Sequence, residues 1–417
     1  MKLEFGYGNR TETVVVPDHA LRETLLPNAV PHERTGRSAV EYALSHPIGS
    51  KRLSEIVSPG ETVAIVTSDV SRPFPSYMVL PPVLRELFSA GIRQEDVTVV
   101  FALGSHRHHT EEEKAALVGE EVYKTVRTVD SDPDDCVRLG MTKRGTPVDI
   151  TRSVAEADRI IALGNIEFHY FAGYSGGAKA LMPGVSSMEA IEANHRMMVL
   201  PEACAGSLDE NPLRQDIEEA GEMAGIDFIV NVVLDEHKKI VFAAAGDKVL
   251  AHRAGCRYLD RMYRKTIAEK ADIVLVSQGG SPKDANLYQT QKALENAKYA
   301  VKNGGSVILI GACAEGLGSK KFEEWLTGAS SPDELVERIG RKFELGGHKA
   351  AAIGLVLQKA KIYLVSEMDR EFVKSIFFLP ASSAQEAFDR AFSEYGPDAT
   401  VIAMPYGGST LPSPVTP

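Results

Sequence analysis

Short apolar segments alternate with amphipathic helical patterns along most of this chain of 417 residues. The apolar segments are rich in Val and Ile and nearly continuous, which is typical of parallel strands covered on both faces. They occupy residues 62–67, 97–102, 159–163, 228–234, 273–276, 306–310, 362–365 and 400–403. The helical patterns occupy residues 76–90, 187–198, 212–225, 248–265, 287–303 and 383–392. This alternation predicts an α/β fold with mostly parallel sheets flanked by helices.

The length of the chain indicates two domains rather than one. Residues 247–270 are charged and helical in pattern, and a new strand–helix–strand unit begins at Asp272. We therefore expect an N-terminal α/β domain over residues 1–268 and a C-terminal α/β domain over residues 269–417. The proline-rich residues 409–417 are expected to be disordered or an extended tail.

Composition excludes several classes of protein. The formal net charge of −11 argues against a general binder of nucleic acid or of anionic membranes. Neither a secretory h-region nor a transmembrane run is visible in the sequence, so a cytoplasmic protein is expected. The four cysteines are far apart and form no C-x-x-C pair, which argues against a zinc knuckle, an iron–sulfur cluster or a disulfide framework.

Polar side chains gather where predicted strands end, and the carboxyl ends of parallel strands are where α/β sheets hold ligands. Asp69 and Arg72 follow the first strand. Arg72 can grip a carboxylate or phosphate, although a local salt bridge between the two is an equal alternative. His106 follows the next strand and suits acid/base chemistry. A metal cluster of His106, His108 and His109 is less favoured than solvent-facing or capping roles for the last two.

A glycine-rich loop carries Lys179 between His169 and His195. Its glycines let the backbone bend tightly and approach a bound molecule, and a lysine after such a bend can hold a phosphate or attack a carbonyl or thioacid group. A P-loop is excluded because Ala178 separates the last glycine from Lys179 and Ala180 replaces the hydroxyl residue. A solvated lysine at a helix start is the plain alternative, although a helix N-terminus disfavours a positive charge.

Two further groups are ambiguous by themselves. His195 lies near the end of a predicted helix, where a charged imidazole is stabilised, so a capping role is favoured over metal ligation. Gln289 and Lys292 share one face near the start of another predicted helix. They suit an anionic substrate, but an ordinary polar helix face is the simpler interpretation.

Together these residues resemble the nickel-pincer lactate racemase family over most of the chain. The matching patterns are D-x-x-R-P at 69–73, G-x-H-R at 104–107, H-x-x-A-G-[FY]-S-G-G-x-K at 169–179, P-G at 183–184, N-H at 194–195 and Y-Q-x-x-K at 288–292. Each pattern is weak alone, whereas the ordered set is highly specific.

The resemblance implies a nickel-pincer nucleotide, a pyridinium-3,5-bisthiocarboxylic acid mononucleotide that holds Ni and is covalently attached to Lys179. It also implies that His195 is the protein ligand of nickel and that His106 and His169 are the catalytic acid/base pair. The remaining implied cofactor-binding residues are Asp69, Arg72, Gly173, Ser175, Gly176 and Gly177. The implied substrate-binding residues are Arg72, Tyr288, Gln289 and Lys292. The resemblance thus implies a cofactor-binding domain over residues 1–268 and a substrate-side domain over residues 269–417, with the active site in the interdomain cleft.

The implied activity is a racemase or epimerase that interconverts stereoisomers of a 2-hydroxy acid by reversible hydride transfer. Lactate is the default substrate, and malate, aryl-lactate or an aldonic acid fits the same chemistry. Removal of the Cα proton of a 2-hydroxy acid is difficult because this carbon is a very weak acid, and hydride transfer avoids the carbanion. Formation of either stereoisomer needs a base on each side of the substrate. The implied partners are cofactor-synthesis and nickel-insertion proteins, with no nucleic acid or membrane. A nicotinamide-dependent 2-hydroxy acid dehydrogenase is disfavoured by the missing G-x-G-x-x-G, and a cofactor-delivery protein would leave the two histidines unused.

Overall fold

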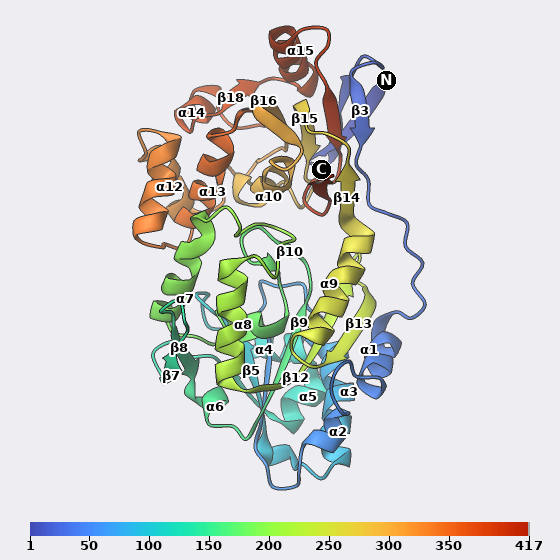
Figure 1. Ribbon diagram of the computed structural model, residues 1–417, viewed down its shortest axis with the longest axis vertical. Coiled ribbons are helices and arrows are strands. Elements are labelled where there is room, and N and C mark those ends of the chain that lie inside the picture. The colour runs from blue at the N-terminus through green and yellow to red at the C-terminus, as the bar shows by residue number, and fades with distance from the viewer. Residues whose placement is uncertain (416–417) are drawn as a thin grey trace. The chain divides into compact units, whose positions relative to one another are not determined.

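The computed structural model describes residues 1–415, and its backbone groups into two compact units (Figure 1). The central unit comprises residues 30–261, and the terminal unit comprises residues 1–29 and the chain from Met262 onward. The boundary expected from the sequence lies instead at 268/269, with the first residues in the N-terminal domain. The difference arises because β3 (Leu21–Thr24) pairs with β19 (Val401–Met404). In the same unit, β14 (Arg264–Ile267) pairs with β20 (Leu411–Pro414).

The central unit contains a six-stranded sheet in the order β13-β12-β9-β4-β5-β6, in which only β13 is antiparallel to its neighbour. The strands are β4 (Val63–Ser68), β5 (Val97–Ala102), β6 (Arg127–Asp130), β9 (Arg159–Asn165), β12 (Ile226–Leu234) and β13 (Ile240–Gly246). Two small antiparallel pairs are β7 (Cys136–Met141) with β8 (Pro147–Thr151), and β10 (Phe168–His169) with β11 (Gly173–Tyr174). The helices are α1 (Gly36–Ser45), α2 (Leu53–Ile56), α3 (Ser76–Ser89), α4 (Glu111–Val118), α5 (Glu120–Thr125), α6 (Arg152–Ala155), α7 (Met188–His195), α8 (Pro212–Ala224) and α9 (Leu250–Tyr263), with 3-10 turns η1 (Gln94–Asp96), η2 (Gly177–Ala180) and η3 (Arg196–Val199).

The strand order of the central unit creates a switch point between β4 and β9. From β4 the chain builds β5 and β6 on one side, and it then returns to build β9 and β12 on the other side. The loops that leave the carboxyl ends of β4 and β9 therefore diverge, which is where open α/β sheets hold ligands. Asp69 follows β4, and the glycine loop follows β9.

The terminal unit contains a six-stranded, all-parallel sheet in the order β18-β17-β16-β15-β19-β3. Its remaining strands are β15 (Ala271–Ser277), β16 (Val301–Ile310), β17 (Ala360–Val365) and β18 (Leu379–Ala381), with a separate hairpin of β1 (Lys2–Tyr7) and β2 (Arg10–Val15). Its helices are α10 (Leu287–Ala297), α11 (Lys320–Thr327), α12 (Pro332–Arg341), α13 (Gly347–Leu357), α14 (Arg370–Ser375) and α15 (Ala384–Tyr395).

The structure confirms the predicted α/β class with two mainly parallel sheets. Every predicted strand is present, and the central-unit core is built from the Val and Ile side chains of these strands, including fully buried Ile65, Val99 and Ile161. Among the described helices, none has both the length and the apolar character needed to cross a lipid bilayer.

Three expectations about the second half of the chain are wrong in detail. The predicted helix 287–303 ends at Ala297, and its last residues begin β16. The helical pattern of 247–270 ends at Tyr263 because β14 follows at once. The expected tail contains β20, whose pairing with β14 orders it, while residues 416–417 lie outside the described residues.

Candidate active site

The side chains of Asp69 and His106 are hydrogen-bonded beyond the ends of β4 and β5. Oδ2 of Asp69 lies 2.7 Å from Nδ1 of His106, and Oδ1 of Asp69 accepts a hydrogen bond of 2.9 Å from the Ser71 hydroxyl. Burial of Asp69, which is 3% exposed, favours a higher pKa, but the bond to His106 and the His106 charge, with Ser71 and Arg72, lower the pKa of this carboxyl. Because Nδ1 donates to Asp69, the neutral ring of His106 keeps its lone pair on Nε2, as a general base requires.

The Arg72 guanidinium is exposed and has no ion-pair partner within the described chain. Only its backbone N–H is engaged locally, donating to the carbonyl of Asp69 at 3.1 Å. The local salt bridge considered from the sequence is absent because the Asp69 carboxylate faces His106. An exposed, unpaired guanidinium is available for a phosphate or a carboxylate.

His109 is buried, so the expectation of a solvent-facing or capping role for it is wrong. Its Nδ1 lies 2.6 Å from Oδ1 of Asp130, and its Nε2 accepts a bond of 3.0 Å from the backbone N–H of Val70. His109 thus ties the turn after β4 to the end of β6. His108 is exposed, and Thr110 caps α4 as predicted. No cluster of three or more His, Cys, Asp or Glu side chains suited to a metal occurs among residues 1–415.

Phe171 brings three predicted site residues together. Its ring centroid lies 4.5 Å from that of His169 and 4.9 Å from that of His195, and Nζ of Lys179 lies 6.0 Å from it. Phe171 is 3% exposed, and its carbonyl accepts a bond of 2.8 Å from Nδ2 of Asn211. The sequence analysis did not single out Phe171, because an apolar residue inside a motif carries no chemical signal of its own.

His169 is held by the hairpin of β10 and β11. Its Nδ1 accepts a hydrogen bond of 3.2 Å from the backbone N–H of Ala172, and its ring stacks on Tyr170 at a centroid distance of 5.4 Å. An accepting Nδ1 places the proton of the neutral ring on Nε2. His106 and His169 therefore have opposite tautomers in this arrangement.

The glycine loop packs closely against the protein. A Cβ atom on Gly173 would lie 1.8 Å from the carbonyl oxygen of Ser207, and one on Gly176 would lie 2.8 Å from Oδ1 of Asn231. The Ser175 hydroxyl donates to the carbonyl of Asn165 at 2.7 Å and accepts from the backbone N–H of Glu167 at 2.8 Å. Protein packing therefore accounts for these small residues, and their contacts with a cofactor remain predictions.

Lys179 lies in the short 3-10 turn η2. The alternative considered from the sequence, a solvated lysine at the start of a longer helix, is therefore not observed. Burial, together with the positive charges of Arg72 and Arg214, lowers the pKa of the Lys179 amine well below its usual value. No carboxylate within the described chain is paired with this amine. A lysine that loses its proton readily is suited to nucleophilic attack.

His195 is the last residue of α7, and a chain of hydrogen bonds orients its ring. Its Nδ1 lies 3.2 Å from Oδ1 of buried Asn194. Nδ2 of Asn194 donates to Oδ2 of buried Asp216 at 2.7 Å and to the carbonyl of Leu213 at 3.3 Å. These donations fix Oδ1 of Asn194 as an acceptor, so Nδ1 of His195 carries the proton and Nε2 keeps the lone pair that binds metals.

The terminal unit holds Tyr288, Gln289 and Lys292 on α10, as the pattern predicted. The N-cap residue Asn286 accepts a bond of 3.1 Å from the backbone N–H of Gln289. Buried Lys349 donates to the Tyr288 carbonyl at 2.8 Å, and its Nζ lies 4.2 Å from the centroid of the Tyr288 ring. The first turn of α10 is thus held in place, and the substrate contacts of its side chains remain predictions.

The residues of the central unit fit the implied cofactor. A lone oriented imidazole binds a transition metal tightly only with further donors, and a nucleotide with carbon and sulfur donors supplies them. Arg72 is available for an anionic group, and Lys179 has the low pKa that bond formation to a thioacid needs. His195 would bind the metal, Lys179 would attach the nucleotide and Arg72 would hold an anionic group, so these three residues are consistent with the implied cofactor.

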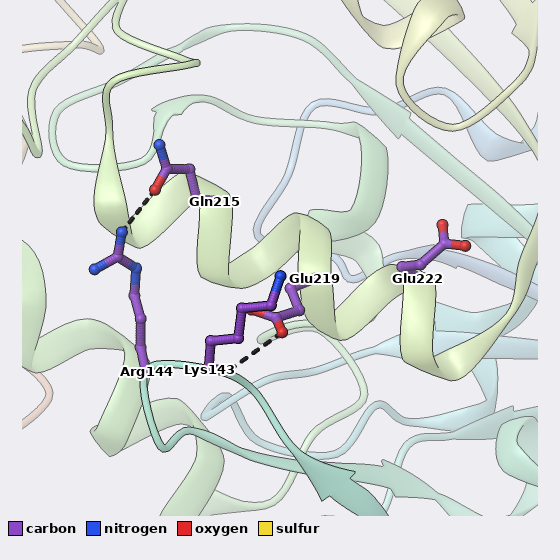
Figure 2. Close-up of a pocket in the computed structure, with 5 residues that line it drawn as sticks. All are labelled: Lys143, Arg144, Gln215, Glu219 and Glu222. Carbon is purple, nitrogen blue, oxygen red and sulfur yellow. Dashed lines mark hydrogen bonds between the residues drawn. The ribbon is translucent and has the colours of Figure 1, made fainter.

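A surface pocket of about 570 Å³ lies on the outer side of α8, apart from these residues (Figure 2). It is lined by Lys143, Arg144, Gln215, Glu219 and Glu222. Arg144 donates to Oε1 of Gln215 at 2.6 Å, and the backbone N–H of Lys143 donates to Oε1 of Glu219 at 3.2 Å (Figure 2). Glu222 is paired with Lys248 at 2.7 Å, so most of the polar groups of this pocket already have protein partners, and we assign no ligand to it.

Two family models and several known proteins match the chain over nearly its full length. Residues 7–206 match the lactate racemase N-terminal domain, and residues 266–411 match the lactate racemase C-terminal domain. A protein named lactate racemase from Thermoanaerobacterium thermosaccharolyticum is 33% identical over 421 residues, covering 98% of each chain. Another of that name, from Lactiplantibacillus plantarum, is 31% identical over 97% of this chain and 98% of its own.

Solved structures agree with the sequence matches. The lactate racemase apoprotein from Thermoanaerobacterium thermosaccharolyticum has a TM-score of 0.89 at 32% identity, covering 99% of this chain and 100% of that one. A protein from Thermotoga maritima has a TM-score of 0.65 at 18% identity, covering 91% of this chain and 98% of its own, and shows the shared fold alone.

Proposed function

This chain belongs to the lactate racemase family, and from that membership and the site geometry we propose that it interconverts the stereoisomers of a 2-hydroxy acid. Lactate is the first substrate to test, because relatives that are about one third identical are named for it. Malate, aryl-lactates and aldonic acids carry the same reacting group and are the alternatives. The contacts of Phe171 with His169, Lys179 and His195 are the observation that carries the proposal.

The proposed cofactor is the nickel-pincer nucleotide, and when bound it supplies a hydride acceptor. Lys179 provides the attachment point, where its nitrogen bonds to a thioacid carbon and water or hydrogen sulfide leaves. His195 contributes Nε2 to the nickel, while Asp69, Arg72, Ser175 and the backbone of the glycine loop contact the nucleotide. Proteins that make the cofactor and insert the metal are the proposed partners.

The chain's own residues handle the proton and the carboxylate of the substrate. Nε2 of His106 takes the hydroxyl proton, and the Asp69 carboxylate stabilises the imidazolium that forms. His169 takes the hydroxyl proton of the opposite stereoisomer. Its own proton must leave Nε2 before that nitrogen can act as a base. Arg72 grips the substrate carboxylate, and Tyr288, Gln289 and Lys292 are the other proposed substrate contacts.

The test combines intact mass, nickel analysis and a chiral assay. Protein produced together with the cofactor-making enzymes should gain the cofactor mass on Lys179 and interconvert both isomers of one 2-hydroxy acid from the candidate panel. The variants Lys179→Ala and His195→Ala should lose the added mass and the nickel, respectively. Full activity in protein with an unmodified Lys179 would refute the proposal, and full nickel occupancy in His195→Ala would refute the ligand assignment.

A further inference from the structure

A buried guanidinium lies beneath the glycine loop. Arg214, near the start of α8, is 1% exposed. Its Nη1 donates to the carbonyls of Tyr174 at 3.2 Å and Gly176 at 3.3 Å, and its Nε donates to Oε1 of Glu218 at 2.7 Å. Burial of a cation is costly unless it is paired and hydrogen-bonded, so these contacts keep Arg214 in this position.

His252 on α9 completes the support of the loop. It is fully buried, and its Nε2 donates to the carbonyl of Ser175 at 2.8 Å. Its Nδ1 accepts from Nη2 of Arg214 at 3.1 Å, and burial beside this guanidinium lowers the pKa of His252 well below its usual value. Neutral His252 and Arg214 therefore hold three successive carbonyls, those of Tyr174, Ser175 and Gly176.

The loop is shaped to fit this pair. Gly177 has a φ of +60°, and a Cβ atom there would lie 2.8 Å from Nη2 of Arg214 and 3.0 Å from Cγ of His252. Its backbone N–H donates to Oδ1 of Asn231 at 2.8 Å. The turn that presents Lys179 two residues later thus rests directly on Arg214 and His252.

Glu218 neutralises only part of the charge under the loop. It accepts from Nε of Arg214 and also from Nη1 of Arg253, each at 2.7 Å, and Asp209 accepts from Nη2 of Arg253 at 3.0 Å. Both guanidinium groups contact the one partly buried carboxylate of Glu218. Burial lowers the pKa of the Lys179 amine, and the positive charge of Arg214 lowers it further because it disfavours the ammonium form.

We propose that Arg214 is a positioning residue for cofactor attachment: it fixes the turn that carries Lys179 and places a positive charge beside the Lys179 amine. The inference rests on the proposed attachment at Lys179 and extends it to a residue that itself contacts neither cofactor nor substrate. The two effects of Arg214 are separable. Arg214→Lys keeps the positive charge but loses the several N–H donors of the guanidinium, whereas Arg214→Gln removes the charge.

The first measurement needs no cofactor and no variant. Cofactor-free protein is treated with a limiting amount of acetic anhydride over a range of pH, and acetylation of Lys179 is quantified by peptide mass spectrometry. Lys179 should reach half-maximal labelling at a clearly lower pH than exposed Lys143, because burial and the charges of Arg72 and Arg214 lower the pKa of its amine. The same midpoint for both lysines in folded wild-type protein would overturn the proposal.

The variants then separate charge from geometry. In Arg214→Gln the Lys179 midpoint should rise, while in Arg214→Lys it should stay close to wild type, because only the first change removes the positive charge. Both should carry at least about tenfold less attached cofactor after co-production with the cofactor-making enzymes, since 1.4 kcal/mol of lost positioning corresponds to a factor of about ten. Arg144→Gln is the matched control, because Arg144 contacts the solvent side of α8 and its loss should change neither quantity.

The outcomes distinguish the two proposals. If wild-type protein carries no cofactor on Lys179, the proposed function fails, while the labelling midpoints still report on the charge effect. If wild type carries the cofactor and folded Arg214→Gln carries as much with an unchanged midpoint, the positioning role is refuted. Should Arg214→Gln fail to fold, Arg214→Lys and the wild-type midpoint decide the question.

Discussion

Replacing Asn194 with leucine should weaken nickel binding without altering the metal ligand. Asn194 is fully buried and links Nδ1 of His195 to Oδ2 of Asp216 and to the carbonyl of Leu213. Leucine is close to asparagine in size, so the change removes hydrogen bonds and leaves little cavity. The loss of a partner that orients a metal-bound histidine typically costs about 10- to 100-fold in metal affinity, or about 1.4–2.8 kcal/mol.

The same substitution should also destabilise the fold, because a buried carboxylate oxygen of Asp216 loses its amide donor. Leaving a charged buried acceptor without this partner costs about 1.5–3 kcal/mol in the free energy of unfolding. Thr142→Ala is the matched control, since the Thr142 hydroxyl donates to the other oxygen of Asp216. That variant should lose a comparable stability while the orientation of Asn194 and the nickel affinity stay unchanged.

The assay measures nickel released into a chelator per cofactor-bearing chain, and denaturant unfolding gives the stability of each variant. Nitrogen-15 NMR of the cofactor-free protein reports which ring nitrogen of His195 carries the proton. Wild-type protein should show the Nδ1–H form, and Asn194→Leu should show a mixture of tautomers. If nickel leaves Asn194→Leu as slowly as wild type and the tautomer is unchanged, the orienting chain has no role in nickel binding.

Three other predictions follow from the same site. Phe171→Ala should lower the free energy of unfolding by about 3–5 kcal/mol and abolish cofactor attachment, because the buried ring contacts His169, Lys179 and His195 and positions them; thermal unfolding and intact mass check this. The pKa of Asp69 is lower folded than unfolded, so its stabilisation is present above its unfolded pKa of about 4 and is lost as the pH falls through the folded pKa. In Asp69→Asn the free energy of unfolding should therefore fall less steeply as the pH is lowered into the acid range. An unchanged pH dependence would contradict the pairing of Asp69 with His106. Nitrogen-15 NMR should find opposite neutral tautomers for His106 and His169, and a common tautomer would show that the Ala172 contact does not hold in solution.

The strands were predictable where burial is two-sided. Runs such as 97–102 and 306–310 are nearly all apolar, and both lie inside parallel sheets. The first strands were not recognised, because β1 alternates exposed and buried side chains and β3 is only four residues long. The pairing of β3 with β19 joins segments more than 370 residues apart, and no local pattern records such a contact. The domain boundary drawn from local patterns consequently differs from the grouping of contacts.

The site was predictable where residue type itself carries chemistry. Asp69 and His106 meet because β4 and β5 are neighbouring parallel strands, as their positions after strand ends implied. His109 and Phe171 were not recognised, because their roles depend on what surrounds them in three dimensions. A histidine bonded to Asp130 and Val70 looks the same in sequence as one in solvent.

The glycine loop shows why a motif can locate a site and still misstate the reason for its residues. The sequence suggested that the glycines make room for a ligand. In the structure the space beside Gly177 is filled by Arg214 and His252, which come from α8 and α9. Gly177 is thus required by the protein's own buried cation, and that cation adds to the burial that lowers the pKa of the Lys179 amine. Arg214 thus contributes both to the shape of the loop and to the reactivity of Lys179, so Arg214→Gln should change both, whereas a loop shaped only by a ligand would let them vary independently.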